Sequence, residues 1–167
     1  MTREGALAVM IGVAVALVAL GVWAWMRRRS RDAQPLVAPG ELPANAVVTA
    51  VFEGLYVATT RHDEPLERIA APGFGMRSGV TITVSDAGIA LDLTGRPRIV
   101  IAADRIDEVG QATVAIDRVV EKDGLTRLVW RTDAGTPVDT YLRPQDASAR
   151  ALSDAIEGIT TQTGTAA

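Results

Sequence analysis

The chain of 167 residues contains no cysteine, one histidine and one lysine, and aromatic residues make up only 4% of it. Without cysteine there can be no disulfide, no thiolate nucleophile and no cysteine metal site. A metal site requires three or four converging ligands, and His62 has no second histidine or cysteine to join it. We therefore expect His62 to be a solvated loop residue, and we predict no metal and no cofactor.

Recognisable catalytic motifs are also missing. A Ser-His-Asp arrangement would have to use His62, and Ser78 does not stand in a Gly-x-Ser-x-Gly elbow. The Gly-Phe-Gly stretch at residues 73–75 is too short for a dinucleotide fingerprint and is typical of a turn. A small acidic cluster comprises Asp104, Asp107 and Glu108. We interpret this cluster as solvated charge beside a turn, and we predict that the protein is not an enzyme.

Positive charge is scarce outside the N-terminus. Residues 1–31 hold five arginines and one glutamate, which leaves 12 basic and 19 acidic residues, a net charge of −7, in residues 32–167. Those 136 residues suit one domain with one core. An acidic domain lacks the general basic field that binds nucleic acid, so nucleic acid is not an expected partner.

The most informative feature that the sequence does contain is an apolar run over residues 7–26. It is 20 residues long and contains no charge, which gives a helix of about 30 Å, the thickness of the hydrocarbon core of a bilayer. The sequence therefore predicts one transmembrane helix, with the lipid bilayer as a partner.

The flanks of this run differ in charge and predict its orientation. Before it stand Arg3 and Glu4, which nearly cancel. The residues that we assign to the membrane interface are Trp23, Trp25, Arg27, Arg28, Arg29 and Arg31. Because arginines are retained on the cytoplasmic side and tryptophans gather at the interface, we expect a plasma-membrane protein with its N-terminus outside and its C-terminal domain in the cytoplasm.

A cleaved signal peptide is the rival interpretation. It requires a positive start, an apolar stretch of about 7–15 residues and small residues at the cleavage site. Here the positive charge lies at the other end, the run is longer, and Trp23, Trp25 and Met26 stand where cleavage would occur. These features favour a permanent anchor.

Composition divides the chain into four parts: a membrane anchor with its basic flank (1–31), a linker rich in proline (32–45), a domain (46–160) and a disordered tail (161–167). Residues 47–60 predict a strand with a bend at Glu53-Gly54. Residues 65–70 look like one or two helical turns, with proline at an early position.

The rest of the domain reads mainly as β-structure. Residues 80–84 and 89–93 alternate apolar and polar side chains around a glycine turn, which predicts a hairpin. Further strands are expected at 98–102, 115–120, 125–132 and 137–142, with an Asp-Gly turn at 123–124 and an ambiguous segment at 103–110. Trp130 lies on an alternating strand, so we expect it in the core.

The period then changes to that of a helix. Leu152, Ile156 and Ile159 recur at helical spacing, and Asp146 is the expected N-cap. The predicted fold class is mainly β with a C-terminal α-helix: a bent antiparallel sheet or partly open barrel of about seven strands, preceded by one transmembrane helix.

This order of elements resembles the pleckstrin-homology (PH)-like superfold. The sequence is similar to a family of small actinobacterial single-pass membrane proteins with a PH-like domain. The residues that carry the likeness are GLYVATTRHDEPLERIAAPGFGMRSGVTITVSDAGIALDL (54–93), with YVATT (56–60) and RIAAPGFG (68–75) the most specific, and LVWRT (128–132) and VDTYLRP (138–144). Such proteins are often labelled membrane, export or transporter proteins, so the resemblance implies a fold and a location.

Lipid-binding members of the superfold share a basic loop between the first two strands. The corresponding residues here, 61–79, mix arginines with Asp63, Glu64 and Glu67, which argues against inositol-lipid binding. The candidate ligand or partner loop comprises Arg61, Arg68, Phe74 and Arg77. Phe74 has two interpretations, as a core residue or as an exposed anchor for a partner, and the core is the more frequent place for a large aromatic side chain.

We therefore expect a membrane-tethered module with a protein-interaction or scaffolding role at the inner face of the plasma membrane, and a membrane-associated protein as its partner. One alternative is an accessory subunit of a membrane transport system. A second is an enzyme of unknown type.

Overall fold

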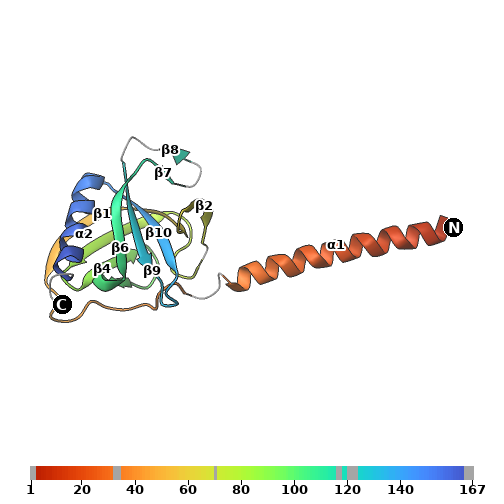
Figure 1. Cartoon of the computed structure of the whole chain (residues 1–167), viewed down its shortest axis with the longest axis horizontal. Coiled ribbons are helices and arrows are strands. Elements are labelled where there is room, and N and C mark those ends of the chain that lie inside the picture. The colour runs from red at the N-terminus through yellow and green to blue at the C-terminus, as the bar shows by residue number, and fades with distance from the viewer. Residues whose placement is uncertain (1–2, 32–34, 70, 116–117, 120–123, 164–167) are drawn as a thin grey trace. The chain divides into compact units, whose positions relative to one another are not determined.

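The computed structural model describes residues 3–31, 35–69, 71–115, 118–119 and 124–163. The chain divides into two compact units, Met1–Gln34 and Pro35–Ala167. Figure 1 shows the elements of each unit. The predicted Asp-Gly turn falls largely on residues outside this description, as do the first part of the predicted linker (32–34) and the last part of the predicted tail (164–167).

Helix α1 (Arg3–Arg31) forms the first unit and contains the predicted apolar run. A stretch of 19 residues, Val9–Arg27, has a mean hydropathy of 2.3 and none of it is buried. Trp23 and Trp25 of this helix are exposed, and the Arg27 guanidinium lies 5.3 Å from the centre of the Trp23 ring. By length and composition α1 can cross a bilayer, and a signal sequence has the same properties.

The second unit is mainly β-structure. Its elements are β1 (Val48–Arg61), β2 (Glu64–Arg68), β3 (Ser78–Ser85), β4 (Gly88–Leu93), β5 (Ile99–Ala102), the 3₁₀ helix η1 (Ala103–Arg105), β6 (Ile106–Ala112), β7 (Val114–Ala115), β8 (Arg118–Val119), β9 (Leu125–Arg131), β10 (Pro137–Pro144) and α2 (Ala149–Thr163). In the described part of the chain, eight strands form one antiparallel sheet in the order β5-β4-β3-β1-β10-β9-β6, with β2 attached to β1. The short strands β7 and β8 pair with each other. This architecture confirms the predicted fold class.

The long strand β1 joins the two halves of the sheet. It pairs with β3 through residues 48–56 and with β10 through residues 54–61. Strands β1 and β10 approach each other closely at Gly54, where a Cβ would collide with the carbonyl oxygen of Arg143. The register of β1 against β10 shifts between Tyr56 and Ala58, so the irregularity lies a little beyond the bend predicted at Glu53-Gly54.

Alternating side chains of the strands build one core. Val80, Ile82 and Val84 of β3 are buried on the inner face, as the alternating pattern predicts. Trp130 is fully buried, which confirms its predicted place in the core. Phe74 packs between the aromatic rings of Tyr56 and Trp130, with ring centres 6.0 and 5.7 Å away.

Helix α2 covers one side of the sheet (Figure 1). The three predicted apolar residues, Leu152, Ile156 and Ile159, are all buried in the core. The predicted N-cap is wrong: the hydroxyl of Ser148 accepts a hydrogen bond from the Ala151 backbone N–H, at 3.1 Å. The Asp146 carboxylate instead accepts a hydrogen bond from the backbone N–H of Glu53, because the chain turns back across β1 before the helix begins.

Two boundaries differ from the predictions. Residues 64–68 form β2 rather than helical turns, because the chain reverses at His62-Asp63 and Arg61 then pairs with Glu64 and Thr60 with Arg68. At the C-terminus α2 continues to Thr163, so residues 161–163, assigned to a disordered tail, are helical. The Thr161 hydroxyl donates to the Glu157 carbonyl and supports this last turn.

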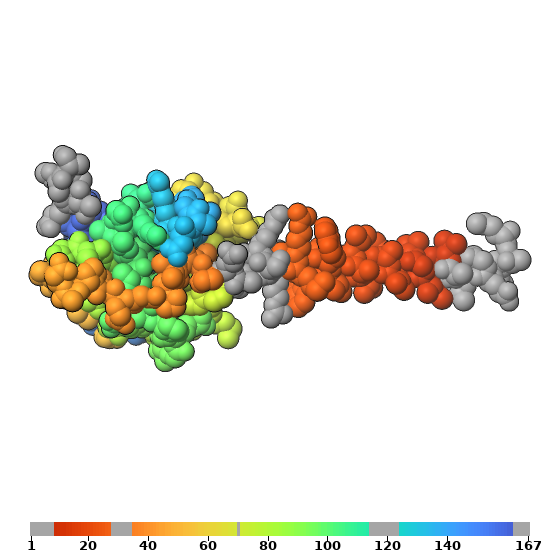
Figure 2. Space-filling view, turned by 90° about the horizontal axis from the view of Figure 1, so that it is seen from below, coloured from red at the N-terminus to blue at the C-terminus, as the bar shows by residue number. Residues whose placement is uncertain are grey.

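The predicted linker is also corrected, because much of it packs on the domain. We call residues 35–41 the N-terminal strap. Val37 is buried in the core, Leu36 packs against the core, and Pro39 forms an isolated bridge with Ile99 of β5. Figure 2 shows the strap in orange along the surface of the domain.

Asp133, in the β9–β10 turn, holds the strap by two hydrogen bonds. Its carboxylate accepts from the Ala38 N–H at 2.9 Å, and its backbone N–H donates to the Leu36 carbonyl at 2.8 Å. The proline residues suggested an unstructured spacer, but proline also suits an edge position that needs no donor. The folded domain therefore begins at about residue 35.

Candidate functional site

The four residues of the predicted partner loop occupy three different environments. Arg61 and Arg77 are exposed, and Arg61 forms an ion pair with Glu67 at 3.3 Å. Phe74 is fully buried, so its interpretation as an exposed anchor for a partner is wrong. The reason is geometric: the turn at residues 71–74 directs Phe74 inward between two other aromatic rings.

Arg68 has a structural position in this loop. Its Nη2 donates to the Val57 carbonyl at 3.2 Å and to the Gly75 carbonyl at 2.5 Å. A guanidinium that is bound to two backbone carbonyls fixes the loop against β1. Of the four predicted residues, Arg61 and Arg77 are thus the ones left on the surface.

The same connection between β1 and β3 exposes two large apolar side chains. Leu66 is 73% exposed and Met76 is 79% exposed. They lie between Arg61 and Arg77 in sequence, and this connection therefore has an apolar surface beside side chains of both charges. Exposed apolar side chains beside charged ones are typical of surfaces that bind other molecules.

A cluster of ionisable residues lies on the outer face of β9 and β10, and no motif in the sequence predicts it. It comprises His62, Asp63, Arg127 and Asp139, which we call the His62 network. Asp139 extends from β10 and its side chain is only 2% exposed. A buried carboxylate requires charged or hydrogen-bonding partners, and His62 and Arg127 provide them.

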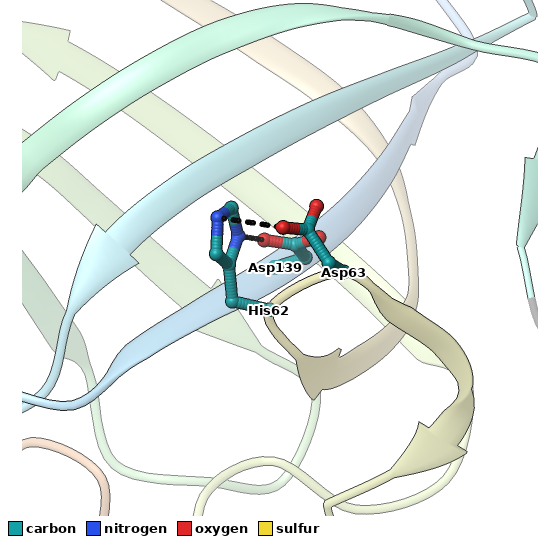
Figure 3. Close-up of side chains that lie close together, drawn as sticks. All are labelled: His62, Asp63 and Asp139. Carbon is teal, nitrogen blue, oxygen red and sulfur yellow. Dashed lines mark hydrogen bonds and ion pairs between the residues drawn. The ribbon is translucent and has the colours of Figure 1, made fainter.

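The imidazole of His62 lies beside the carboxylates of Asp139 and Asp63, and each of its two nitrogens contacts one of them (Figure 3). Its Nδ1 is 2.8 Å from Asp139 Oδ1 and its Nε2 is 3.4 Å from Asp63 Oδ2. The prediction of a solvated loop histidine is therefore wrong: one third of the side chain is exposed, and the ring is held by the buried Asp139. Asp63 occupies a left-handed conformation with φ of 59°, which orients its side chain at the tip of the turn.

Arg127 of β9 contacts the other oxygen of each carboxylate. Its Nε is 3.2 Å from Asp139 Oδ2, and its Nη2 is 3.7 Å from Asp63 Oδ1. The Nε–H is buried and makes this charge contact without the alignment of a hydrogen bond. Each carboxylate thus lies between one arginine and one histidine.

This arrangement raises the pKa of His62 above its ordinary value of 6.5. The largest cause is the hydrogen bond to Asp139, and the negative charges of Asp139 and Asp63 add to it. Desolvation and the positive charge of Arg127 act in the opposite direction. The folded domain therefore favours the protonated imidazole.

A metal ion is the other cation that these donors could hold. One donor atom from each of His62, Asp63 and Asp139 lies within 4.8 Å of the others. A divalent ion on Nε2 would need a neutral imidazole and both carboxylates. In this structure Arg127 already faces both carboxylates, so the donor set suits a proton better than a metal.

A surface hollow of about 410 Å³ adjoins the network. It is lined by His62, Asp107, Glu108, Val129, Arg131, Gly135 and Pro137. Two members of the predicted acidic cluster are here, and Asp107 pairs with Arg131 at 2.9 Å. Asp104 and Glu108 are exposed, in agreement with the interpretation of solvated charge.

Comparison with known proteins identifies the class. The family model described as "Bacterial PH domain-like" matches residues 34–157. The chain therefore belongs to the bacterial PH domain-like family, and the match begins close to the N-terminal strap. Its N-terminal helix α1 is a candidate membrane span.

Two further comparisons add little on function. No curated protein matches the chain. Among solved structures, the C-terminal domain of an unknown protein from Leishmania infantum is similar, with 10% sequence identity and a TM-score of 0.45, over 70% of this chain and 86% of that one. Nothing about the activity of this chain is taken from that likeness.

Proposed function

We propose that the protein is a membrane-tethered PH-like module that binds a protein partner at the inner face of the plasma membrane. The observation that carries the proposal is the exposed apolar stretch Val9–Arg27, joined to a domain of the bacterial PH domain-like family. Residues 9–26 contain no charged side chain and are all exposed, and the exposure of such a stretch to water is strongly unfavourable. Lipid is the environment that such a helix fits.

The orientation rests on the arginines that follow the span. Positive residues close to a span are retained on the cytoplasmic side. Arg27 to Arg31 therefore support a cytoplasmic domain and an N-terminus outside. The net charge of −7 in residues 32–167 supports a protein partner rather than nucleic acid or a general contact with anionic lipid.

A topology experiment tests the tether. Reporters that are active on only one side of the membrane are fused to each end of the full chain, and membranes are extracted at alkaline pH. We expect the chain to stay in the membrane with its C-terminal reporter in the cytoplasm. A variant with Leu17→Arg and Val18→Arg should be released, because each central charge costs about 2.5–3.5 kcal/mol; Leu17→Ala with Val18→Ala is the matched control. Mature protein that begins downstream of Met26 would show a signal sequence instead.

The partner surface that we favour is the β1–β3 connection with its exposed Leu66 and Met76. Proximity labelling from the C-terminal end in living cells should identify a membrane-associated neighbour. Leu66→Ser with Met76→Ser should reduce that labelling about tenfold, as expected when interface anchors are lost. Val47→Ser with Val51→Ser is the matched control, because these two valines are also exposed, but Val47 immediately precedes β1 and Val51 lies in its first half. Equal loss in both variants, or no neighbour at all, would count against this function.

A further inference from the structure

The His62 network is complete only when the imidazole is charged. It contains two carboxylates, and their four oxygens face nitrogens of His62 and Arg127 at 2.8–3.7 Å. With a protonated His62 there are two negative and two positive charges. Each nitrogen of an imidazolium carries a proton, so both His62 contacts are then attractive.

Loss of that proton breaks one side of the network. A neutral imidazole keeps one N–H, and the hydrogen bond to the buried Asp139 is the stronger contact. Nε2 would then carry neither a proton nor a positive charge, so the attraction between the ring and the Asp63 carboxylate is lost. The network would also keep a net charge of −1 around a carboxylate that is 2% exposed, which is costly.

We propose that the turn at Arg61–Asp63 and strand β2 form a proton-dependent latch on the domain. With a charged His62 the latch is closed over β9 and β10. With a neutral His62 it opens, which changes the lining of the adjacent hollow and uncovers Asp139. The latch is a property of the PH-like domain and does not depend on the membrane tether.

The segment that would move has few other attachments. Strand β2 pairs with β1 at only two positions, and its four residues before Arg68 are exposed. Arg68 stays bound to the Val57 and Gly75 carbonyls and is the fixed end of the segment that moves. Asp63 occupies a left-handed conformation, which adds backbone strain for a non-glycine residue. The Arg61–Glu67 ion pair joins the turn to β2 and so moves with it. Segments with few buried contacts open locally at a lower free-energy cost than the core does.

The surrounding charged groups act on the pKa of His62 in both directions. From β10, Asp139 favours the charged imidazole, and Asp63 does so from the turn itself; Arg127 of β9 opposes it. The other charged side chains nearby are Asp107 and Glu108 of β6, Arg131 of β9 and, on β2, Glu64 and Glu67. Tyr141 of β10 has a pKa raised above 10, mainly by burial, so it does not change charge in this range.

The direction of the pH dependence follows from linkage. Because the pKa of His62 is raised in the folded domain, its contribution is fully present below the unfolded value of about 6.5. It is lost as pH rises through the folded pKa. The latch is therefore closed below the ordinary histidine value and opens as pH rises through the raised pKa of His62.

The test uses the full chain in detergent micelles. The single histidine gives one set of imidazole NMR signals, which report its titration and tautomer directly. Hydrogen exchange of residues 61–68 is measured at about pH 5.5 and about pH 8.5, values on either side of an ordinary histidine pKa, and corrected for the intrinsic pH dependence of exchange. We expect exchange to rise by about tenfold or more at the higher pH, as local opening does, while β3 stays protected.

Variants make the result specific. His62→Gln should exchange rapidly at both pH values, and Asp63→Asn, which keeps the buried Asp139 pair, should lower the histidine pKa and weaken the pH effect. Asp92→Asn is the control, because Asp92 pairs with Arg98 away from His62. Exchange that does not change with pH, or the same pH effect in His62→Gln, would overturn the latch. So would protection at high pH that appears only on adding Zn²⁺ and is lost with a chelator, because a metal would then replace the proton.

Discussion

Asp139 and Thr140 are neighbours on β10 and point to opposite faces of the sheet, where each belongs to a different polar network. Thr140 faces the core: its hydroxyl accepts a hydrogen bond from Trp130 Nε1 at 2.9 Å and shares another with Thr59, which in turn accepts from the Tyr56 hydroxyl. Asp139 faces outward and pairs with His62 and Arg127.

The two networks show two ways to place polar groups in a small domain. The inner one is built from neutral groups, and burial raises the pKa of Tyr56, so it keeps the same charge across physiological pH. The outer one is built from charges and closes only with a proton on His62. The inner network therefore stabilises the fold to the same extent across physiological pH, whereas the outer network responds to pH.

The largest expected effect comes from the aromatic residue next to the inner network. Phe74→Ala should lower the free energy of unfolding by about 3–5 kcal/mol, because it leaves a cavity between Tyr56 and Trp130. Chemical denaturation followed by circular dichroism measures it, with the exposed Met76→Ala as control. Unchanged stability with loss of partner labelling would restore the interpretation of Phe74 as a partner anchor.

Asp139→Ala is expected to cost about 3 kcal/mol, because it leaves the partly buried Arg127 without its main counter-charge. Adding Arg127→Met should recover part of the loss. A double-mutant cycle on unfolding free energies measures the coupling. Simple addition of the two single effects would show that the pair does not act as a unit.

Thr140→Val should cost about 2 kcal/mol, because the buried Trp130 N–H and Thr59 hydroxyl lose a partner at nearly constant volume. We expect this loss to be the same at about pH 5.5 and about pH 8.5, on either side of an ordinary histidine pKa. The Asp139 variant should lose more at the lower pH. Equal pH dependence in both variants would remove the distinction between the two networks.

The N-terminal strap tests whether the core extends beyond the sheet. Val37→Ala should lower the free energy of unfolding by about 1–1.5 kcal/mol, since two methyl groups leave a buried site. Val47→Ala, at a 62% exposed position, is the matched control and should change stability by less than about 0.5 kcal/mol. Equal changes in the free energy of unfolding at the two positions would indicate that residues 35–41 are a linker that does not stabilise the domain.

The smallest expected effect is the loss of the stabilising contribution of Asp133 at low pH. The Arg105 guanidinium holds the pKa of Asp133 below its ordinary value of 3.8. The stabilising contribution of Asp133 is thus complete above 3.8 and is lost as pH falls through the lower folded pKa. The Ala38 amide, which donates to this carboxylate, should show an NMR shift only in that acidic window, and Asp133→Asn should abolish it. The strap would then loosen as pH falls through the pKa of Asp133, whereas the latch opens as pH rises through the raised pKa of His62. An Ala38 shift that changed near neutrality would instead couple the two regions.

Local pattern was sufficient for the elements with a clear period. The apolar run predicted α1, the alternation around Asp86–Gly88 predicted the β3–β4 hairpin, and the helical spacing of Leu152, Ile156 and Ile159 predicted α2. The N-terminal boundary of the domain was missed because proline in a spacer and proline in a packed edge segment look alike.

The site was hidden by distance along the chain. His62 and Asp139 are separated by 77 positions, and Ala38 and Asp133 by 95. The one available signal was an aspartate inside the strand pattern of residues 137–142, where a buried charge needs a partner. The lone histidine of the chain was the natural partner to seek.

The sequence by itself determined the apolar N-terminal helix, the β-rich domain and its closing helix, because these depend on the spacing of apolar side chains along one segment. Only the tertiary structure decided that Phe74 is buried, that the strap is part of the domain and that His62 is ionically paired. Those outcomes depend on which distant strands lie side by side, since the pairing of β1 with β10 and of β10 with β9 brings the two carboxylates, the arginine and the histidine together.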